Sequence, residues 1–163
     1  MPGLSGDMET IFFINKDEVP LDRWRDVTYG RIVVSYRPEK DDPYRFRLTV
    51  GGNRITCPWD FSTPTVDKLT VKLLLNSIVS TPNTKFMSID IKDFYLNTLM
   101  PRYEYMQLKL SNLPDNVIRH YKLANIAIKD SHIYTEIRRG MYGILAAEIL
   151  SQHLLEKRLN TEG

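Results

Sequence analysis

The segment from Lys85 to Asn97, KFMSIDIKDFYLN, constrains the fold of this chain more than any other. Apolar and β-branched residues dominate its first positions, which predicts a buried strand from Lys85 to Ile91. Asp90 interrupts that run, and a carboxylate in a buried strand is costly unless it is paired or binds a metal ion. Asp93 and Tyr95 follow at the turn into a short helix. The sequence therefore predicts two carboxylates and a tyrosine at one strand end.

Two carboxylates in this position have two interpretations. In a metal-dependent polymerase, such a carboxylate holds two Mg²⁺ ions, about 3.5 to 4 Å apart, which activate the primer hydroxyl and steady the leaving pyrophosphate. An aromatic ring then forms the floor of the sugar pocket. Alternatively, Asp90 only ends a strand and Asp93 only caps a helix. The carboxylates alone favour the second interpretation, because short motifs often match by chance.

Two β-rich runs, Arg31 to Tyr36 and Tyr44 to Val50, precede this segment and are separated by the turn-forming stretch RPEKDDP. They predict an antiparallel hairpin. Arg45 and Arg47 alternate with apolar residues, so we expect both arginines on one face of the hairpin. That face is suited to a triphosphate, although a solvated strand face explains it equally well. Weaker candidates for the same contact are Arg37 and Lys40.

The other elements follow from periodicity and turn residues. Apolar positions at three- and four-residue steps predict an amphipathic helix from Val66 to Val79, capped by Thr63 or Thr65, that packs beneath the Lys85 to Ile91 strand. The remaining expected elements are a strand or packed segment at Thr10–Asn15, a turn or short helix at Val19–Asp26, strands at Tyr103–Leu110 and Ser131–Ile137, and helices at Leu113–Leu123 and Ala146–Leu159. Together they predict an α+β fold with an antiparallel sheet and helices on one face.

Five sequence blocks occur in a specific order: GGNRI, DFSTPTVDKLTVKLLLNSI, IDIKDFYLN, EYMQL and EIRRGMYGI. With this order and spacing, roughly Tyr36 to Leu159 resembles the reverse transcriptase, an RNA-directed DNA polymerase, of copia-type long-terminal-repeat retrotransposons. The resemblance implies the fingers (31–84) and a partial palm (85–163) of a right-hand polymerase. Residues 1–30 would then be an N-terminal extension that is partly disordered.

The resemblance also implies roles for particular residues. Asp90 would be the catalytic ligand of the two Mg²⁺ ions, and Tyr95 would exclude a ribose 2′-hydroxyl. The residues implied to bind the nucleotide are Arg45 or Arg47, at the triphosphate, together with Asp93, Tyr95, Tyr142 and Gly143. The implied partners are an RNA or DNA template with its primer, deoxynucleoside triphosphates and the remainder of a polyprotein.

The chain departs from the family pattern in two places. Where a glutamine is expected after Tyr142 and Gly143 the chain has Ala146, and Glu148 adds a carboxylate that would repel phosphate. No pair of aspartates follows in a later hairpin, and one carboxylate cannot hold both metal ions. We therefore expect a truncated reverse transcriptase that is inactive alone. The alternatives are a non-catalytic primer-template-binding module and a non-functional remnant.

Length and composition set further limits. The 163 residues suffice for one domain with a core, and a net charge of +2 does not by itself indicate nucleic-acid binding. The single cysteine, Cys57, excludes an internal disulfide, and three scattered histidines give no zinc pattern. The sequence has neither a membrane span nor a signal peptide pattern. We expect an intracellular protein, cytoplasmic or nuclear, that is not secreted and has no membrane partner.

Overall fold

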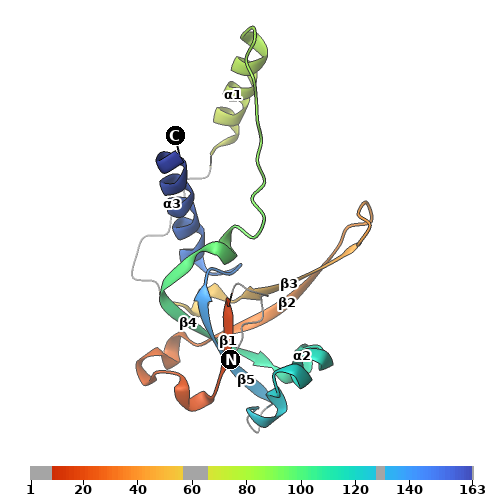
Figure 1. Cartoon of the computed structure of the whole chain (residues 1–163), viewed down its shortest axis with the longest axis vertical. Helices are drawn as coiled ribbons and strands as arrows, with labels where there is room; N and C mark the ends of the chain where they lie inside the picture. The colour runs from red at the N-terminus through yellow and green to blue at the C-terminus, as the bar shows by residue number, and fades with distance from the viewer. Residues whose placement is uncertain (1–8, 57–65, 128–130, 163) are drawn as a thin grey trace.

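The computed structural model describes residues 9–56, 66–127 and 131–162, which form a mixed sheet with helices around it (Figure 1). The strands are β1 (Ile11–Ile14), β2 (Thr28–Tyr36), β3 (Tyr44–Val50), β4 (Leu99–Lys109) and β5 (His132–Arg139), in the spatial order β1-β5-β4-β2-β3. The α-helices are α1 (Lys68–Ser80), α2 (Asp115–His120) and α3 (Leu145–Glu162). The 3-10 helices are η2 (Lys16–Glu18), η3 (Leu21–Asp26), η4 (Gly52–Arg54), η5 (Tyr95–Asn97), η6 (Leu110–Asn112) and η7 (Leu123–Asn125).

The sheet is antiparallel at every junction except the one between β2 and β4. There Thr28 lies opposite Met106 and the two strands run parallel. The prediction of an entirely antiparallel sheet is wrong at this pairing. The reason is that β2, the first strand of the hairpin, lies beside β4, whereas β3 lies at the edge of the sheet. The observed architecture is compatible with an α+β fold.

Alternating side chains give the sheet two covered faces. On one face Met106, Ile133 and Ile137 are fully buried, and they belong to the main apolar core together with residues of α2 and the first part of α3. On the other face Tyr105 and Tyr134 form a smaller cluster against the segment around η3. The expectation of helices on one face holds for α2 and α3, whereas the short η3 covers the opposite face.

Most elements expected from periodicity are confirmed. The β2–β3 hairpin pairs antiparallel, with Val33 opposite Arg47, and β1, β4, β5 and α3 lie where the patterns predict them. The helix expected from Leu113 to Leu123 is shorter, because α2 ends at His120 and Lys122 adopts a left-handed conformation before η7. Residues 10–30, predicted as part of an extension, include β1 and the start of β2.

The strand expected from Lys85 to Ile91 is not formed. The segment is extended and exposed, with Phe86 at 57%, Met87 at 76% and Ile89 at 68% of full exposure. No described residue forms a backbone hydrogen bond with it. The prediction of burial is wrong because an apolar pattern identifies side chains suited to burial, but burial also needs a partner surface.

Helix α1 forms as predicted, but its packing differs from the prediction. None of its residues is buried, and the expected core positions Leu69 and Leu73 are 66% and 60% exposed. Figure 1 shows α1 and the chain after it extending away from the sheet along the long axis. The helix is capped by Asp67, whose carboxylate accepts hydrogen bonds from two backbone N–H groups of the first turn. The predicted caps, Thr63 and Thr65, lie outside the described residues.

Candidate functional site

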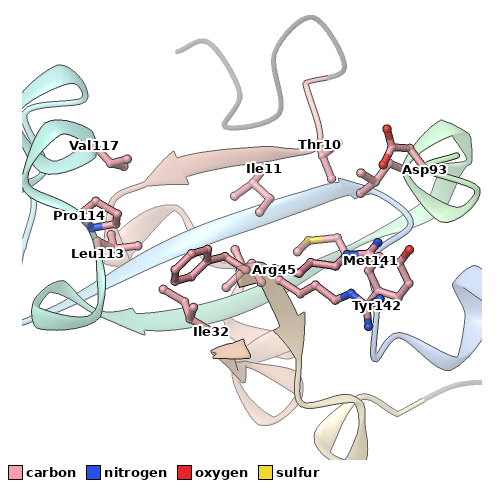
Figure 2. Close-up of a pocket in the computed structure, with 14 residues that line it drawn as sticks. Thr10, Ile11, Ile32, Arg45, Asp93, Leu113, Pro114, Val117, Met141 and Tyr142 are labelled. Atoms are coloured by element: carbon pink, nitrogen blue, oxygen red, sulfur yellow. The ribbon is translucent and has the colours of Figure 1, made fainter. Parts of the chain in front are cut away.

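A cavity of about 500 Å³ lies over the sheet between the hairpin, α2 and the loop before α3 (Figure 2). Its size is within the range of roughly 300–1,000 Å³ that small-molecule sites occupy. Segments far apart in the sequence contribute to its wall. The lining residues are Thr10, Ile11, Ile32, Arg45, Phe46, Arg47, Leu48, Asp93, Leu96, Leu113, Pro114, Val117, Met141 and Tyr142.

Two arginines of β3 give the cavity a basic wall. Arg45 and Arg47 are two residues apart on one strand, so they share a face, and both are half-buried. The guanidinium of Arg47 lies over the ring of Tyr142, 5.6 Å from its centre. Neither arginine forms an ion pair with any residue that the structure describes, and the Nε of Arg47 is buried without a hydrogen-bond partner there. This wall therefore has positive charge available for an anionic ligand.

Asp93 and Thr10 add polar groups to the same cavity. Asp93 adopts a left-handed conformation, with φ of 53°, at the turn that precedes η5. Thr10 is 1% exposed, and its hydroxyl has no hydrogen-bond partner among the described residues. Figure 2 shows Asp93, Met141 and Tyr142 toward one end of the cavity and Leu113, Pro114 and Val117 at the other.

The opposite end of the cavity is apolar because α2 begins there. Pro114 is the N-cap of α2, and its fixed φ suits the start of a helix, so Leu113 and Val117 are held on either side of it. Phe46 of β3 also lines the cavity. A cavity with a basic wall and an apolar end suits a ligand with an anionic group and an apolar or planar body.

Tyr95 and Gly143 lie beside Tyr142 at a second, smaller cavity of about 160 Å³. The rings of Tyr95 and Tyr142 meet edge to face, with centres 5.1 Å apart. Burial raises the pKa of Tyr95, and the negative charge of Glu148 raises it further. Gly143 has φ of 96°, and a Cβ there would collide with the backbone carbonyl of Val50, so this glycine allows the loop to pack against β3.

The structure brings together most, but not all, of the predicted site residues. Arg45, Arg47, Asp93 and Tyr142 line one cavity, and Tyr95 and Gly143 adjoin Tyr142. Asp90, in contrast, is exposed on the extended segment and lines none of these cavities. In the described part of the chain, no three His, Cys, Asp or Glu side chains form a group able to hold a metal ion.

The lining residues that sequence reasoning missed are those without a recognisable chemical pattern. Thr10 and Ile11 reach the cavity only because β1 pairs with β5, at Ile11 opposite Ile137. Leu113 and Val117 reach it only because α2 packs over the sheet. Pro114 lies within the helix predicted from Leu113 to Leu123, a pattern that did not indicate a cavity wall.

Comparison with known proteins identifies no relative. No family model, no curated protein and no solved structure matches the chain. Among the described residues, no helix is both long and apolar enough to cross a membrane.

Proposed function

We propose that the chain binds a deoxynucleoside triphosphate in the 500 Å³ cavity, as the fingers and partial palm of a copia-type reverse transcriptase, and that it does not extend a primer by itself. In this assignment Arg45 and Arg47 contact the triphosphate, and Tyr142 and Asp93 border it. The apolar end at Leu113 and Pro114 receives the body of the nucleotide.

One observation carries this proposal. Arg45 and Arg47, Asp93, and Tyr142 come from three separate segments of the chain, and all four line the same cavity. The resemblance implies the same role for Asp93, for Tyr142 and for one of the two arginines, Arg45 or Arg47. Guanidinium groups bind phosphate through charge-assisted hydrogen bonds, and the buried Nε of Arg47 has no partner of its own among the described residues.

The proposed lack of polymerase activity rests on the carboxylates. Two-metal transfer needs several carboxylates around both ions, and Asp90 is the single residue here with that expected role. The sequence has one Asp-Asp pair, Asp41 and Asp42, and it lies in the turn of the β2–β3 hairpin. Mg²⁺ remains an expected cofactor of a complete enzyme.

Titration with thymidine triphosphate tests the binding site. Because the triphosphate contact is charge-assisted, Arg47→Ala should weaken binding by roughly tenfold or more, and Arg45→Ala should act in the same direction. The matched control is Arg31→Ala. Arg31 is an exposed arginine of the same hairpin, and its guanidinium carbon lies 4.7 Å from the centre of the Tyr29 ring. Isothermal titration calorimetry with EDTA present measures the affinity of the protein for the triphosphate in the absence of a divalent metal ion.

Two results would contradict the proposal. Equal affinities of the wild-type chain, Arg47→Ala and Arg45→Ala for the triphosphate would place the ligand elsewhere. Measurable primer extension by the pure chain with template, nucleotides and Mg²⁺ would show that the expected lack of activity is wrong.

A second candidate function is binding of primer and template without chemistry. It is favoured by the basic residues of the hairpin, because Arg31, Arg37, Arg45 and Arg47 form no ion pair within the described residues. The logarithm of duplex affinity should then fall linearly with the logarithm of salt concentration. Arg31→Ala would weaken duplex binding in this case, whereas it leaves nucleotide binding unchanged, so the two functions are distinguishable.

A further inference from the structure

Strand β3 lies at one edge of the sheet, and its outer side has backbone groups without partners. It pairs with β2 alone, and the hydrogen bond from the N–H of Arg37 to the carbonyl of Pro43 fixes which residue pairs of the hairpin exchange hydrogen bonds. By this alternation the N–H and C=O groups of Phe46 and Leu48 point away from β2. They form no hydrogen bond with any residue that the structure describes. An edge of this kind is a template for an added strand.

The loop before α3 already uses one end of this edge. The N–H of Val50 also points away from β2, and it donates a hydrogen bond of 2.8 Å to the carbonyl of Tyr142. This bond agrees with the alternation along β3. Next to it, four consecutive residues, Arg45–Leu48, line the 500 Å³ cavity. Neighbouring side chains of a strand lie on opposite faces, so the cavity adjoins the edge of β3 and not one face alone.

Charge decides which kind of strand can pair at this edge. Side chains opposite each other on adjacent strands lie on the same face, so a partner presents two side chains, two residues apart, to Arg45 and Arg47. Neither arginine forms an ion pair with a described residue. A second copy of β3 is disfavoured, because antiparallel pairing centred on residue 45, 46 or 47 would place arginine opposite arginine. A nucleic-acid backbone has no N–H groups for the outward carbonyls of Phe46 and Leu48.

We infer that the edge of β3 binds an extended peptide as an added antiparallel strand, with two acidic side chains, two residues apart, opposite Arg45 and Arg47. The apolar residue between them lies opposite Phe46 and exchanges two backbone hydrogen bonds with it. Antiparallel pairing is favoured because it is slightly more stable per residue than parallel pairing. Phe46 is 69% exposed, so its ring is accessible to an apolar partner.

This inference does not rest on nucleotide binding. Both ligands contact Arg45 and Arg47, so the peptide and the triphosphate should displace each other. A chain that binds the peptide but not thymidine triphosphate would overturn the proposed function and support this inference.

NMR titration of the isotopically labelled chain with acetyl-Val-Glu-Val-Glu-Val-amide tests the pairing. The amides of Phe46 and Leu48 should shift and should become protected from hydrogen exchange. The same peptide with lysine in place of glutamate should bind at least roughly tenfold more weakly. Arg47→Ala should weaken binding of the glutamate peptide by a similar factor. Arg31→Ala, on β2 and so one strand further from the edge, should leave it nearly unchanged.

N-methylation of the peptide separates backbone pairing from charge. A methyl group on the nitrogen of the central valine removes the N–H that faces Phe46, so the affinity should fall by at least roughly tenfold. A methyl group on the nitrogen of a glutamate is the control, because that N–H points away from β3.

A proline at the edge makes the same test on the protein. Phe46→Pro removes the outward N–H without removing a hydrogen bond to β2. It should weaken peptide binding more than Phe46→Ala, which loses the ring but keeps the N–H. Circular dichroism checks that both variants fold.

Four results would overturn the inference. The first is a glutamate peptide that causes neither shifts nor protection at Phe46 and Leu48. The second is equal binding of the two N-methylated peptides, which would leave charge attraction alone. The third is protection of the two amides without any peptide, which would show that a second copy of the chain covers the edge. The fourth is tighter binding of an oligothymidylate at the same amides, which would assign the edge to nucleic acid.

Discussion

The guanidinium carbon of Arg47 lies 5.6 Å from the centre of the Tyr142 ring, which connects strand β3 to the loop before α3. Tyr142 in turn meets Tyr95 edge to face, so one aromatic ring contacts residues from two other segments. The backbone reinforces this junction, because the N–H of Val50 donates a hydrogen bond of 2.8 Å to the carbonyl of Tyr142. The candidate site is therefore held together at Tyr142.

Tyr142→Ala should weaken nucleotide binding by roughly 2- to 30-fold, because the arginine loses a cation–π contact of about 0.5–2 kcal/mol that orients it. Tyr142→Phe keeps the ring and should retain most of the affinity. Calorimetric titration with the triphosphate measures both. Equal losses for the two variants would indicate that the hydroxyl, and not the ring, matters.

Gly143→Ala should destabilise the fold by roughly 3 kcal/mol or more, since the new Cβ meets the carbonyl of Val50 while φ is 96°. Urea unfolding measures this loss. The control is Leu145→Ala, at an exposed position two residues later. A Gly143→Ala protein as stable as the control would mean that the loop can leave β3 at little cost.

Stability should depend on pH through Glu104, which is 2% exposed and paired with Arg102 at 2.9 Å and with Arg23. Burial raises the pKa of Glu104 above its usual 4.5, and the two arginines offset part of this effect. The folded carboxyl therefore binds a proton more readily than the unfolded one. The stabilisation that comes from this difference in pKa is complete below pH 4.5 and is lost as the pH rises through the pKa of Glu104 in the folded protein.

Glu104→Gln removes this titration. The free energy of unfolding of the wild-type chain minus that of Glu104→Gln should therefore fall as the pH rises above 4.5. Urea unfolding from about pH 4 to about pH 8 measures the difference. A difference that stays constant over this range would show that the pKa of Glu104 is not raised by folding.

Asp26 in the same ionic cluster should behave in the opposite way. Burial would raise its pKa, but hydrogen bonds from Thr56 and Arg23 outweigh burial and lower it below 3.8. The stability that Asp26 contributes is present above pH 3.8 and is lost as the pH falls through the folded pKa. Asp26→Asn should therefore reduce the acid sensitivity of unfolding, and a variant that unfolds in acid as the wild type does would contradict this.

Helix α1 should depend strongly on its cap. It has 13 residues with none buried, and isolated helices of this length are marginal in water. Hydrogen bonds from Thr70 and Leu69 lower the pKa of Asp67, so the capping contribution is present above pH 3.8 and is lost as the pH falls below it. Asp67→Ala should reduce the helical signal in circular dichroism with little change in the main unfolding transition. Asp67→Ser, which can still cap, should retain more helix.

The sequence by itself determined the local elements of this protein. Turn residues and alternation predicted the β2–β3 hairpin, and apolar spacing predicted α1 and α3, because these features depend on neighbours in the chain. The same alternation placed Arg45 and Arg47 on one face. The predicted strand ends at Ile137 and the predicted helix begins at Ala146, so Tyr142 and Gly143 were expected in the connection between them.

Only the tertiary structure decided which of these elements are buried and which meet. The patterns of α1 and of the Lys85–Ile91 segment predict burial, yet both are exposed because no described surface covers them. Asp90 belongs to the same segment, so its expected place at the end of a buried strand also depended on a covering surface, and Asp90 is exposed. Pairing of β2 with β4 and the meeting of Arg47 with Tyr142 depend on contacts between distant segments, and periodicity along the chain contains no information about those distances.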